Sequence, residues 1–234
     1  MNGLSPAIIE WARQALLSQG YAIKNRIPEK IQITPWSHVV RFATSGGSVY
    51  LKHTPKLLAL EAQITQILHD QFHASVPIVI TANEEFHYFL MEDAGQTLRA
   101  YLKTNFQPDF NTNNILFNPV TQQLIFIDWG EIVMSHPFFA LHNFLLQAIK
   151  HHDVKESAPL YQKLQEACCK NWLDCTSKNQ LLEAFSLIKK LWPIYSGLAY
   201  HRLMMAVDTQ ALKSIYGNRL AGYLRKLIQN SISR

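Results

Sequence analysis

The sequence has no apolar run long enough to cross a bilayer, and its first residues lack the charged segment and apolar stretch of a secretory signal. Low-complexity segments and internal repeats are also absent, so neither a biased tract nor a repeat architecture is indicated. The chain has 234 residues, of which 48% are hydrophobic and 17% charged. This length allows one large domain or two small lobes. We therefore expect a soluble globular protein with a cytoplasmic location.

Cysteine is scarce, with three residues that all lie in one C-terminal region: Cys168, Cys169 and Cys175. The count is odd, and no second Cys/His pair stands at zinc spacing, so we expect reduced thiols. Two adjacent cysteines on a helix point in different directions, which does not favour a metal site there.

The charge pattern also excludes some partners. The net charge is +5, which suits anionic ligands such as nucleotides. Lysine and arginine are spread along the chain and do not form a stripe interleaved with aromatic residues, so nucleic-acid binding is not expected. We expect no membrane partner either.

One stretch carries most of the chemistry, and it reads D-F-N-T-N-N-I-L-F-N-P-V-T-Q-Q-L-I-F-I-D-W-G from Asp109 to Gly130. A polar loop leads into two short strands, Ile115–Phe117 and Leu124–Ile127, which are joined by a turn at Asn118-Pro119. Such a hairpin brings Asp109, Asn114 and Asp128 to one edge. Two carboxylates and an amide oxygen there suit Mg²⁺ holding the phosphates of a nucleotide. The alternative is a polar hairpin whose Asp and Asn are ordinary turn residues.

D-x-x-x-x-N followed by I-D-W-G resembles the catalytic and metal-binding core of the aminoglycoside phosphotransferase and choline kinase-like superfamily, the small-molecule relatives of protein kinases. The resemblance implies that Asp109 is the catalytic residue beside the acceptor hydroxyl and that Asn114 and Asp128 hold Mg²⁺. ATP and Mg²⁺ are the cofactors it implies, and a small molecule with a hydroxyl group is the substrate.

The first half of the chain fits an N-terminal lobe of this kind. A helix is predicted from Pro6 to Gly20, with Ile9, Ala12, Leu16 and Leu17 on its apolar face. Strands are predicted over residues 31–34, 39–44, 48–52, 78–81 and 86–91, with a helix over residues 55–72 between the third and the fourth. The turn at Ser45-Gly46-Gly47 is a strong hairpin signal.

Lys52 ends the third strand, and Glu61 lies on the helix that follows. By resemblance, the lysine steadies the α and β phosphates and the glutamate holds the lysine in place. Without the resemblance, the simpler interpretation is that Lys52 is a surface residue of a strand and Glu61 an exposed charged residue of a helix. By position, Glu92, Asp93 and Ala94 form the hinge between the lobes, where backbone groups bind adenine. The turn T-P-W-S-H at residues 34–38 lacks a G-x-G-x-x-G pattern, and its contact with phosphate is an open expectation.

The chain departs from the family between the hinge helix, expected from Thr97 to about Lys103, and Asp109. Only residues 104–108 separate the two, where kinase-like enzymes place a sizeable helical segment. Gln107-Pro108 replaces the usual His-Gly. Lost support would leave apolar surface on later helices uncovered unless another helix or a partner covers it. Two alternatives stay open: a form with impaired activity, or a compact variant rebuilt from its other helices.

Helices are predicted from about Pro137 and over residues 158–172, 178–192, 193–207 and 209–230. Four of their aromatic residues could line an acceptor site but more often belong to a core: Trp192, Tyr195, Tyr200 and Tyr216. Carboxylates are dispersed through this half, which lowers the case for an aminoglycoside substrate.

Together these patterns predict an α+β fold of the protein kinase-like type. It would have an antiparallel-sheet nucleotide-binding lobe over residues 1–95 and a mostly helical lobe over residues 96–234. We expect a phosphotransferase with an alcohol group as acceptor. The alternative is a catalytically impaired relative that binds nucleotide or a protein partner. Self-association through an uncovered apolar face is also possible.

Overall fold

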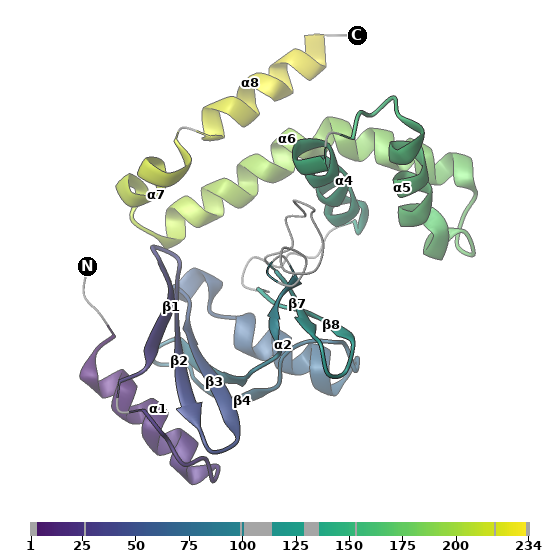
Figure 1. Ribbon diagram of the computed structural model, residues 1–234. Coiled ribbons are helices and arrows are strands. Elements are labelled where there is room, and N and C mark those ends of the chain that lie inside the picture. The colour runs from purple at the N-terminus through teal and green to yellow at the C-terminus, as the bar shows by residue number, and fades with distance from the viewer. Residues whose placement is uncertain are drawn as a thin grey trace. The chain divides into compact units, whose positions relative to one another are not determined.

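The computed structural model describes residues 4–25, 27–98, 100, 114–128, 136–152, 154–217 and 219–232. Over these residues the protein is α+β, with a five-stranded and a three-stranded antiparallel sheet and seven α-helices (Figure 1). Within the described ranges, no helix combines the length and the apolar character needed to cross a bilayer.

The chain forms two compact units, and each is assembled from separate segments. The first contains residues 1–97, 114–132 and 202–215, and the second contains residues 98–113, 133–201 and 216–234. The expected domains, residues 1–95 and 96–234, are each one continuous segment, whereas each of these units consists of three separate segments.

The first unit is built around the larger sheet, whose strand order is β1-β2-β3-β5-β4. Its strands are β1 (Glu29–Thr34), β2 (Ser37–Thr44), β3 (Gly47–His53), β4 (Val79–Asn83) and β5 (Tyr88–Glu92). Each predicted strand overlaps one of them. The smaller sheet consists of β6 (Gln96–Thr97), β7 (Ile115–Asn118) and β8 (Gln123–Phe126).

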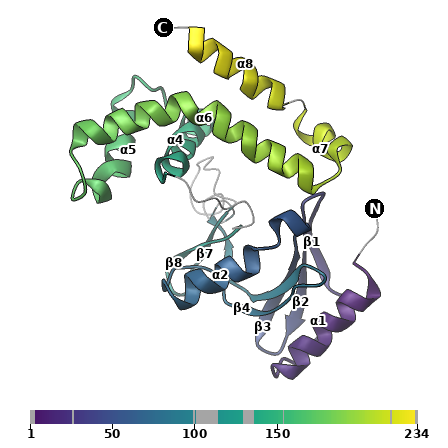
Figure 2. The same cartoon turned by 180° about the vertical axis from the view of Figure 1, so that it is seen from behind.

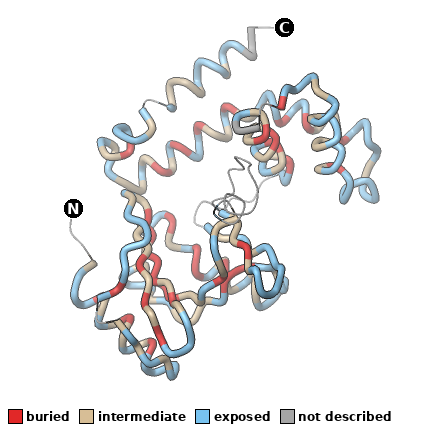
Figure 3. Tube along the Cα trace, viewed as in Figure 1, coloured by how far each residue is buried: buried red, intermediate tan, exposed pale blue. Residues whose placement is uncertain are grey.

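Helix α1 (Pro6–Ser18) packs on one face of the larger sheet (Figure 1). Ser5 caps it by accepting a hydrogen bond from the Ile8 N–H, and Pro6 occupies the first turn. Its buried face is Ile8, Ala12 and Leu16, which pack against β2, β3 and β5. Figure 3 marks the buried positions along the chain in red. The prediction that Leu17 shares this face was wrong, because its side chain is 61% exposed.

The connection from β3 to β4 holds a 3₁₀ turn, η1 (Lys56–Leu58), and helix α2 (Glu61–Asp70). The predicted helix over residues 55–72 is therefore interrupted. This break places Glu61 in the first turn of α2.

The second unit is helical and contains α4 (Phe138–His152), α5 (Pro159–Cys169), η2 (Lys170–Trp172) and α8 (Arg219–Ile232). Helix α6 (Lys178–Ala206) contributes all but its last residues to this unit, and α7 (Thr209–Tyr216) follows it. Helices α4 and α5 pack on the first half of α6 (Figure 2). Their core contains Phe138, Leu145, Cys169, Leu181, Phe185 and Ile188.

Two predicted boundaries among these helices were wrong. Helix α6 continues through Pro193, where a new helix was expected. A proline removes one helical hydrogen bond, and packing on both sides of it holds the helix together: Phe185 and Ile188 lie in the core, and Tyr195 stacks on Phe139 at 4.4 Å. The predicted helix over residues 209–230 divides into α7 and α8 at Gly217, whose φ is +64°.

Candidate functional site

Lys52 lies on the face of the larger sheet opposite α1. Side chains alternate along a strand, and Val49 and Leu51 are in the α1 core, so Lys52 points to the other face. Its Nζ lies 2.7 Å from Oε1 of Glu61, and both residues are buried, with 6% and 3% exposure. The structure therefore brings the strand lysine and the helix glutamate together in an ion pair.

Asp128 joins this pair from the smaller sheet. Its Oδ1 accepts a hydrogen bond from Lys52 Nζ at 2.9 Å, and its Oδ2 accepts one from Asn114 Nδ2 at 3.3 Å. The φ angle of Asp128 is +72°, in the left-handed region that few residues other than glycine adopt. Aspartate and asparagine tolerate this region best, and such backbone outliers gather at functional sites.

The electrostatics of the group follow from one ammonium between two carboxylates. Burial lowers the pKa of Lys52, but the charges of Glu61 and Asp128 outweigh that effect and raise the pKa above its ordinary value. Lys52 is therefore cationic at neutral pH. Asp128 is the accessible member, with a side chain 51% exposed, so a ligand can reach its carboxylate from solvent.

The hairpin that carries Asn114 and Asp128 is held by backbone contacts. The Ile127 N–H donates to the Asn114 carbonyl at 3.0 Å, and the Phe126 N–H donates to the Ser75 carbonyl at 2.8 Å. Gly95 approaches the same hairpin so closely that a methyl group on its Cα would lie 2.5 Å from the Phe117 carbonyl oxygen. Only glycine fits there, since its φ is also +106°.

The expected hinge follows β5. The Glu92 N–H donates to the Ile78 carbonyl, and Asp93 Oδ1 accepts a hydrogen bond from the Gly95 N–H at 2.9 Å. Ala94 is buried, and its N–H has no hydrogen-bond partner among the described residues. The segment thus has a free backbone donor of the kind that the base of a nucleotide needs.

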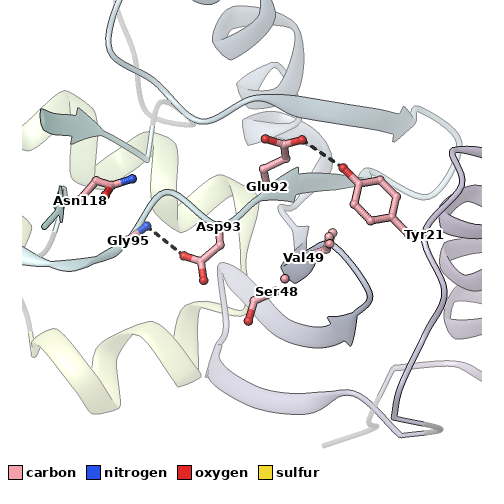
Figure 4. A pocket seen from close by; sticks show the side chains of 9 residues that line it. Tyr21, Ser48, Val49, Glu92, Asp93, Gly95 and Asn118 are labelled. Atoms are coloured by element: carbon pink, nitrogen blue, oxygen red, sulfur yellow. Dashed lines mark hydrogen bonds between the residues drawn. The ribbon is translucent and has the colours of Figure 1, made fainter. Parts of the chain in front are cut away.

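A cavity of about 360 Å³ lies beside this segment (Figure 4). Two of its lining residues are joined by a hydrogen bond, which the Tyr21 hydroxyl donates to Glu92 Oε1 at 3.0 Å. Burial, followed by the hydrogen bond to Glu92, raises the pKa of Tyr21. The residues lining the cavity are Tyr21, Gly46, Gly47, Ser48, Val49, Glu92, Asp93, Gly95 and Asn118.

Tyr50 is a candidate that sequence reasoning missed. It lies two residues before Lys52 on β3, so it shares the face of Lys52, and it pairs with Met91 of β5. Burial raises the pKa of its phenol, as does the nearby charge of Asp93. An aromatic ring between the lysine and the expected hinge could stack on a base. Its position two residues before Lys52 in the sequence could have indicated that it shares the face of the strand with that lysine.

Asp109, the expected catalytic residue, lies outside the described residues, as does most of the helix expected from Thr97 to Lys103. In the described part of the chain, no group of three or more His, Cys, Asp or Glu side chains could hold a metal ion. The oxygen ligands within reach are those of Asn114 and Asp128.

The four aromatic residues suggested either for an acceptor site or for a core make the following contacts. Trp192 and Tyr195 stack on each other at 5.4 Å, with Phe139 beside them. The Tyr200 hydroxyl donates to the Gly217 carbonyl, and the ring of Tyr216 lies under Arg219. The three cysteines are free thiols, as expected.

Comparison with models of known protein families and with curated proteins gives no match to this chain. The kinase-like resemblance therefore rests on the residues themselves and on the geometry described above.

Proposed function

We propose that the protein is an ATP- and Mg²⁺-dependent phosphotransferase that acts on a hydroxyl group of a small molecule. One observation carries the proposal: the buried Lys52 ammonium contacts both Glu61 and Asp128, at 2.7 and 2.9 Å. Phosphoryl-transfer sites of the kinase type need a lysine for the phosphates, a glutamate that braces it and an aspartate for the metal. These residues come from three separate elements, so their contact depends on the tertiary fold and not only on closeness in the sequence.

The order of the elements supports a two-lobed, kinase-like arrangement. The lysine lies on the third strand, the glutamate on the next helix, and the expected hinge after the fifth strand, as the resemblance implies. The metal-binding pair follows on a separate hairpin.

The donor set fits a hard divalent cation in part. Asn114 and Asp128 are neighbours, since Asn114 Nδ2 donates to Asp128 Oδ2 at 3.3 Å, and each side chain carries an oxygen of the kind that Mg²⁺ prefers. Asn114 Oδ1 accepts no hydrogen bond from the described residues, so it is available as a ligand. When bound, Mg²⁺ neutralises the negative charge that develops during transfer.

Each residue then has a distinct task. Lys52, braced by Glu61, positions the nucleotide phosphates, and Asn114 and Asp128 hold the metal. Asp109 orients the acceptor hydroxyl or accepts its proton. The free Ala94 N–H and the Tyr50 ring bind the base. Aminoglycosides are less favoured acceptors because the carboxylates of residues 133–234 are dispersed.

Nucleotide binding is tested by thermal unfolding with ATP, with and without Mg²⁺. The wild type should show a metal-dependent rise in Tm, because a ligand that binds only the folded state stabilises it. Asp128→Asn should abolish this rise while it keeps a residue that tolerates a positive φ. Asp70→Asn, at an exposed position on α2, is the matched control and should respond like the wild type. No response in the wild type would refute the proposal.

Catalysis is tested by ATP turnover with aminoglycosides, choline-like alcohols and sugars. Turnover with at least one acceptor, reduced by two orders of magnitude or more in Asp109→Asn, would establish the enzyme.

The second candidate is a catalytically impaired relative that binds nucleotide or a protein partner. The short segment of residues 104–108 favours it, as does Pro108, which removes a backbone N–H just before Asp109. Apolar side chains are also exposed on α6, by 41–67% at Leu187, Leu191, Ile194 and Leu198. Stabilisation by ATP and Mg²⁺ without turnover of any acceptor would support this candidate.

A further inference from the structure

Helix α8 carries an apolar stripe in which two side chains are half-buried and two are exposed. Leu220, Leu224, Leu227 and Ile228 recur at spacings of four, three and one, which places them on one side of the helix. Leu224 is 52% exposed and Ile228 is 58% exposed. A surface helix of a globular protein normally buries its apolar stripe against the core. We therefore expect the exposed part of this stripe to bind a partner.

The start of α8 is fixed by contacts within the second unit. A methyl group at Gly197 of α6 would lie 3.7 Å from Leu220 Cδ1 and 3.8 Å from Tyr223 Cβ. The Tyr200 hydroxyl donates to the Gly217 carbonyl at 3.0 Å, just before the helix begins. The first turn is therefore anchored on α6, beside which α8 lies in Figures 1 and 2. The exposed part of the stripe begins one turn later.

The charges on α8 are all of one sign. Arg219, Arg225 and Lys226 are its charged residues, and the sequence has no Asp or Glu from Thr209 to the last residue. At about 100° per residue, Arg225 lies roughly 60° beyond Ile228 on one side of the stripe, and Arg219 lies roughly 80° beyond Leu227 on the other, where its guanidinium also lies over the Tyr216 ring. Lys226 lies nearly opposite the stripe. The polar side of the helix is therefore cationic.

We propose that α8 binds the surface of anionic lipid bilayers, with its axis in the membrane plane. A basic amphipathic helix of this kind buries its apolar side chains at the headgroup boundary while its cations contact anionic headgroups. Pairing of α8 with α8 of a second copy is less favoured, because neither helix has an acidic residue to pair with the cations of the other. The proposal departs from the sequence expectation of no membrane partner. That expectation depended on the lack of a spanning run, which a surface-bound helix does not need.

The test is cosedimentation of the full-length protein with vesicles of phosphatidylcholine alone or mixed with phosphatidylserine. Binding is expected to the mixed vesicles, weakly or not at all to the neutral ones, and to fall as salt is raised. The double variant Leu224→Gln/Ile228→Gln should bind at least about tenfold more weakly, because it removes two apolar anchors. Leu160→Gln/Leu187→Gln is the control: both leucines are exposed, on α5 and α6, and binding should not change.

The charges have a matched test of their own. Arg225→Gln/Lys226→Gln should weaken binding to mixed vesicles several-fold, whereas Lys155→Gln/Lys163→Gln, at exposed positions outside α8, should leave it unchanged. Circular dichroism and Tm establish that each variant is folded.

Three results would overturn the proposal. The first is no binding to mixed vesicles, and the second is equal binding to both kinds. The third is a lipid-free oligomer or a complex with polyglutamate that Leu224→Gln/Ile228→Gln abolishes while vesicle binding stays intact. That last result would assign α8 to a protein contact.

Discussion

Lys52 shares one ammonium group between two carboxylates that differ in their surroundings. Glu61 is buried, whereas Asp128 is half-exposed. Under the proposed function, a metal ion bound at Asp128 would compete with Lys52 for the carboxylate oxygens, and the lysine would then have an N–H donor free for phosphate. The contact between Lys52 and Glu61 would stay the same.

The buried Lys52–Glu61 pair should matter far more for stability than the exposed Arg41–Glu29 pair on the same sheet. Lys52→Met leaves Glu61 buried without its cation and should lower the free energy of unfolding by about 3 kcal/mol. Arg41→Met should cost no more than about 1 kcal/mol. Urea denaturation measures both values.

A double variant separates charge burial from packing. Lys52→Met/Glu61→Leu removes both charges, so it should recover most of the stability lost in Lys52→Met. If the double variant is less stable than the single one, the pair contributes through packing and not through charge compensation.

His53 should make stability sensitive to acid. Burial, with the nearby His38 and His87, lowers its pKa from 6.5 to about 4. Between these two pH values the unfolded chain binds a proton that the folded chain does not, so the free energy of unfolding falls as the pH drops from 6.5 to 4. We expect a loss on the order of 1 kcal/mol, allowing for screening of this partly exposed ring.

Urea denaturation at pH 7 and pH 4.5 measures the effect. The decline should be smaller in His53→Gln than in the wild type, and unchanged in His201→Gln, which removes an exposed histidine on α6. Equal declines in all three proteins would contradict the assignment to His53.

At this scale, sequence reasoning named four residues that the structure brings together: Lys52, Glu61, Asn114 and Asp128. Their spacing within short motifs was informative because each motif forms one local element. Tyr21 was not named, because its contact with Glu92 spans 71 residues and leaves no local pattern. The left-handed backbone at Asp128 was also not anticipated, since aspartate is common in turns for other reasons.

Among the elements, the hairpin of β7 and β8 is fixed by backbone contacts on two sides. Ser75 contacts it before β4, and Gly95 approaches it after β5. The position of Asn114 and Asp128 therefore depends on residues that touch neither side chain.

Gly95→Ala should test this dependence. The added methyl group would lie 2.5 Å from a backbone oxygen, so the hairpin must move. We expect a loss of roughly 2–4 kcal/mol in the free energy of unfolding, together with weaker stabilisation by ATP and Mg²⁺. Gly20→Ala is the control, because it also has a positive φ, +82°, but open space around the methyl group, and it lies outside the cavity beside the expected hinge. It should cost about 1 kcal/mol and leave the nucleotide response unchanged.

Element types were easier to predict than element ends. Every predicted strand has a counterpart because alternation and turn residues mark strands locally. The predicted helix end at Pro193 was wrong because tertiary packing holds the helix together through the proline. The helix end at Gly217 was missed because a single glycine, with no proline or capping residue beside it, is a weak local signal. The exposure of Leu17 was missed for a related reason: periodicity gives the apolar side of α1, and only the sheet selects which part of it is covered.

On the scale of the whole molecule, the division into two units could not be predicted from the sequence. The chain passes between the units five times, and α6 contributes residues to both. Sequence patterns are local, whereas membership of a unit depends on contacts between segments more than one hundred residues apart.

This connectivity predicts a single cooperative unfolding transition. Each unit needs three separate segments, so loss of one unit releases the ends of segments that the other requires. Differential scanning calorimetry should give one peak, with a van't Hoff enthalpy close to the calorimetric enthalpy. Two resolved peaks would show that the units unfold independently.

The segmented build of the first unit also has a consequence for synthesis. Residues 202–215 belong to the unit that carries Lys52 and Asp128, yet a ribosome adds them only after residues 133–201 of the other unit. The first unit therefore cannot be completed until most of the second unit has been synthesised. A message truncated between the codons for residues 128 and 202 yields a polypeptide that holds Lys52, Asn114 and Asp128 but lacks one segment of the unit that carries them.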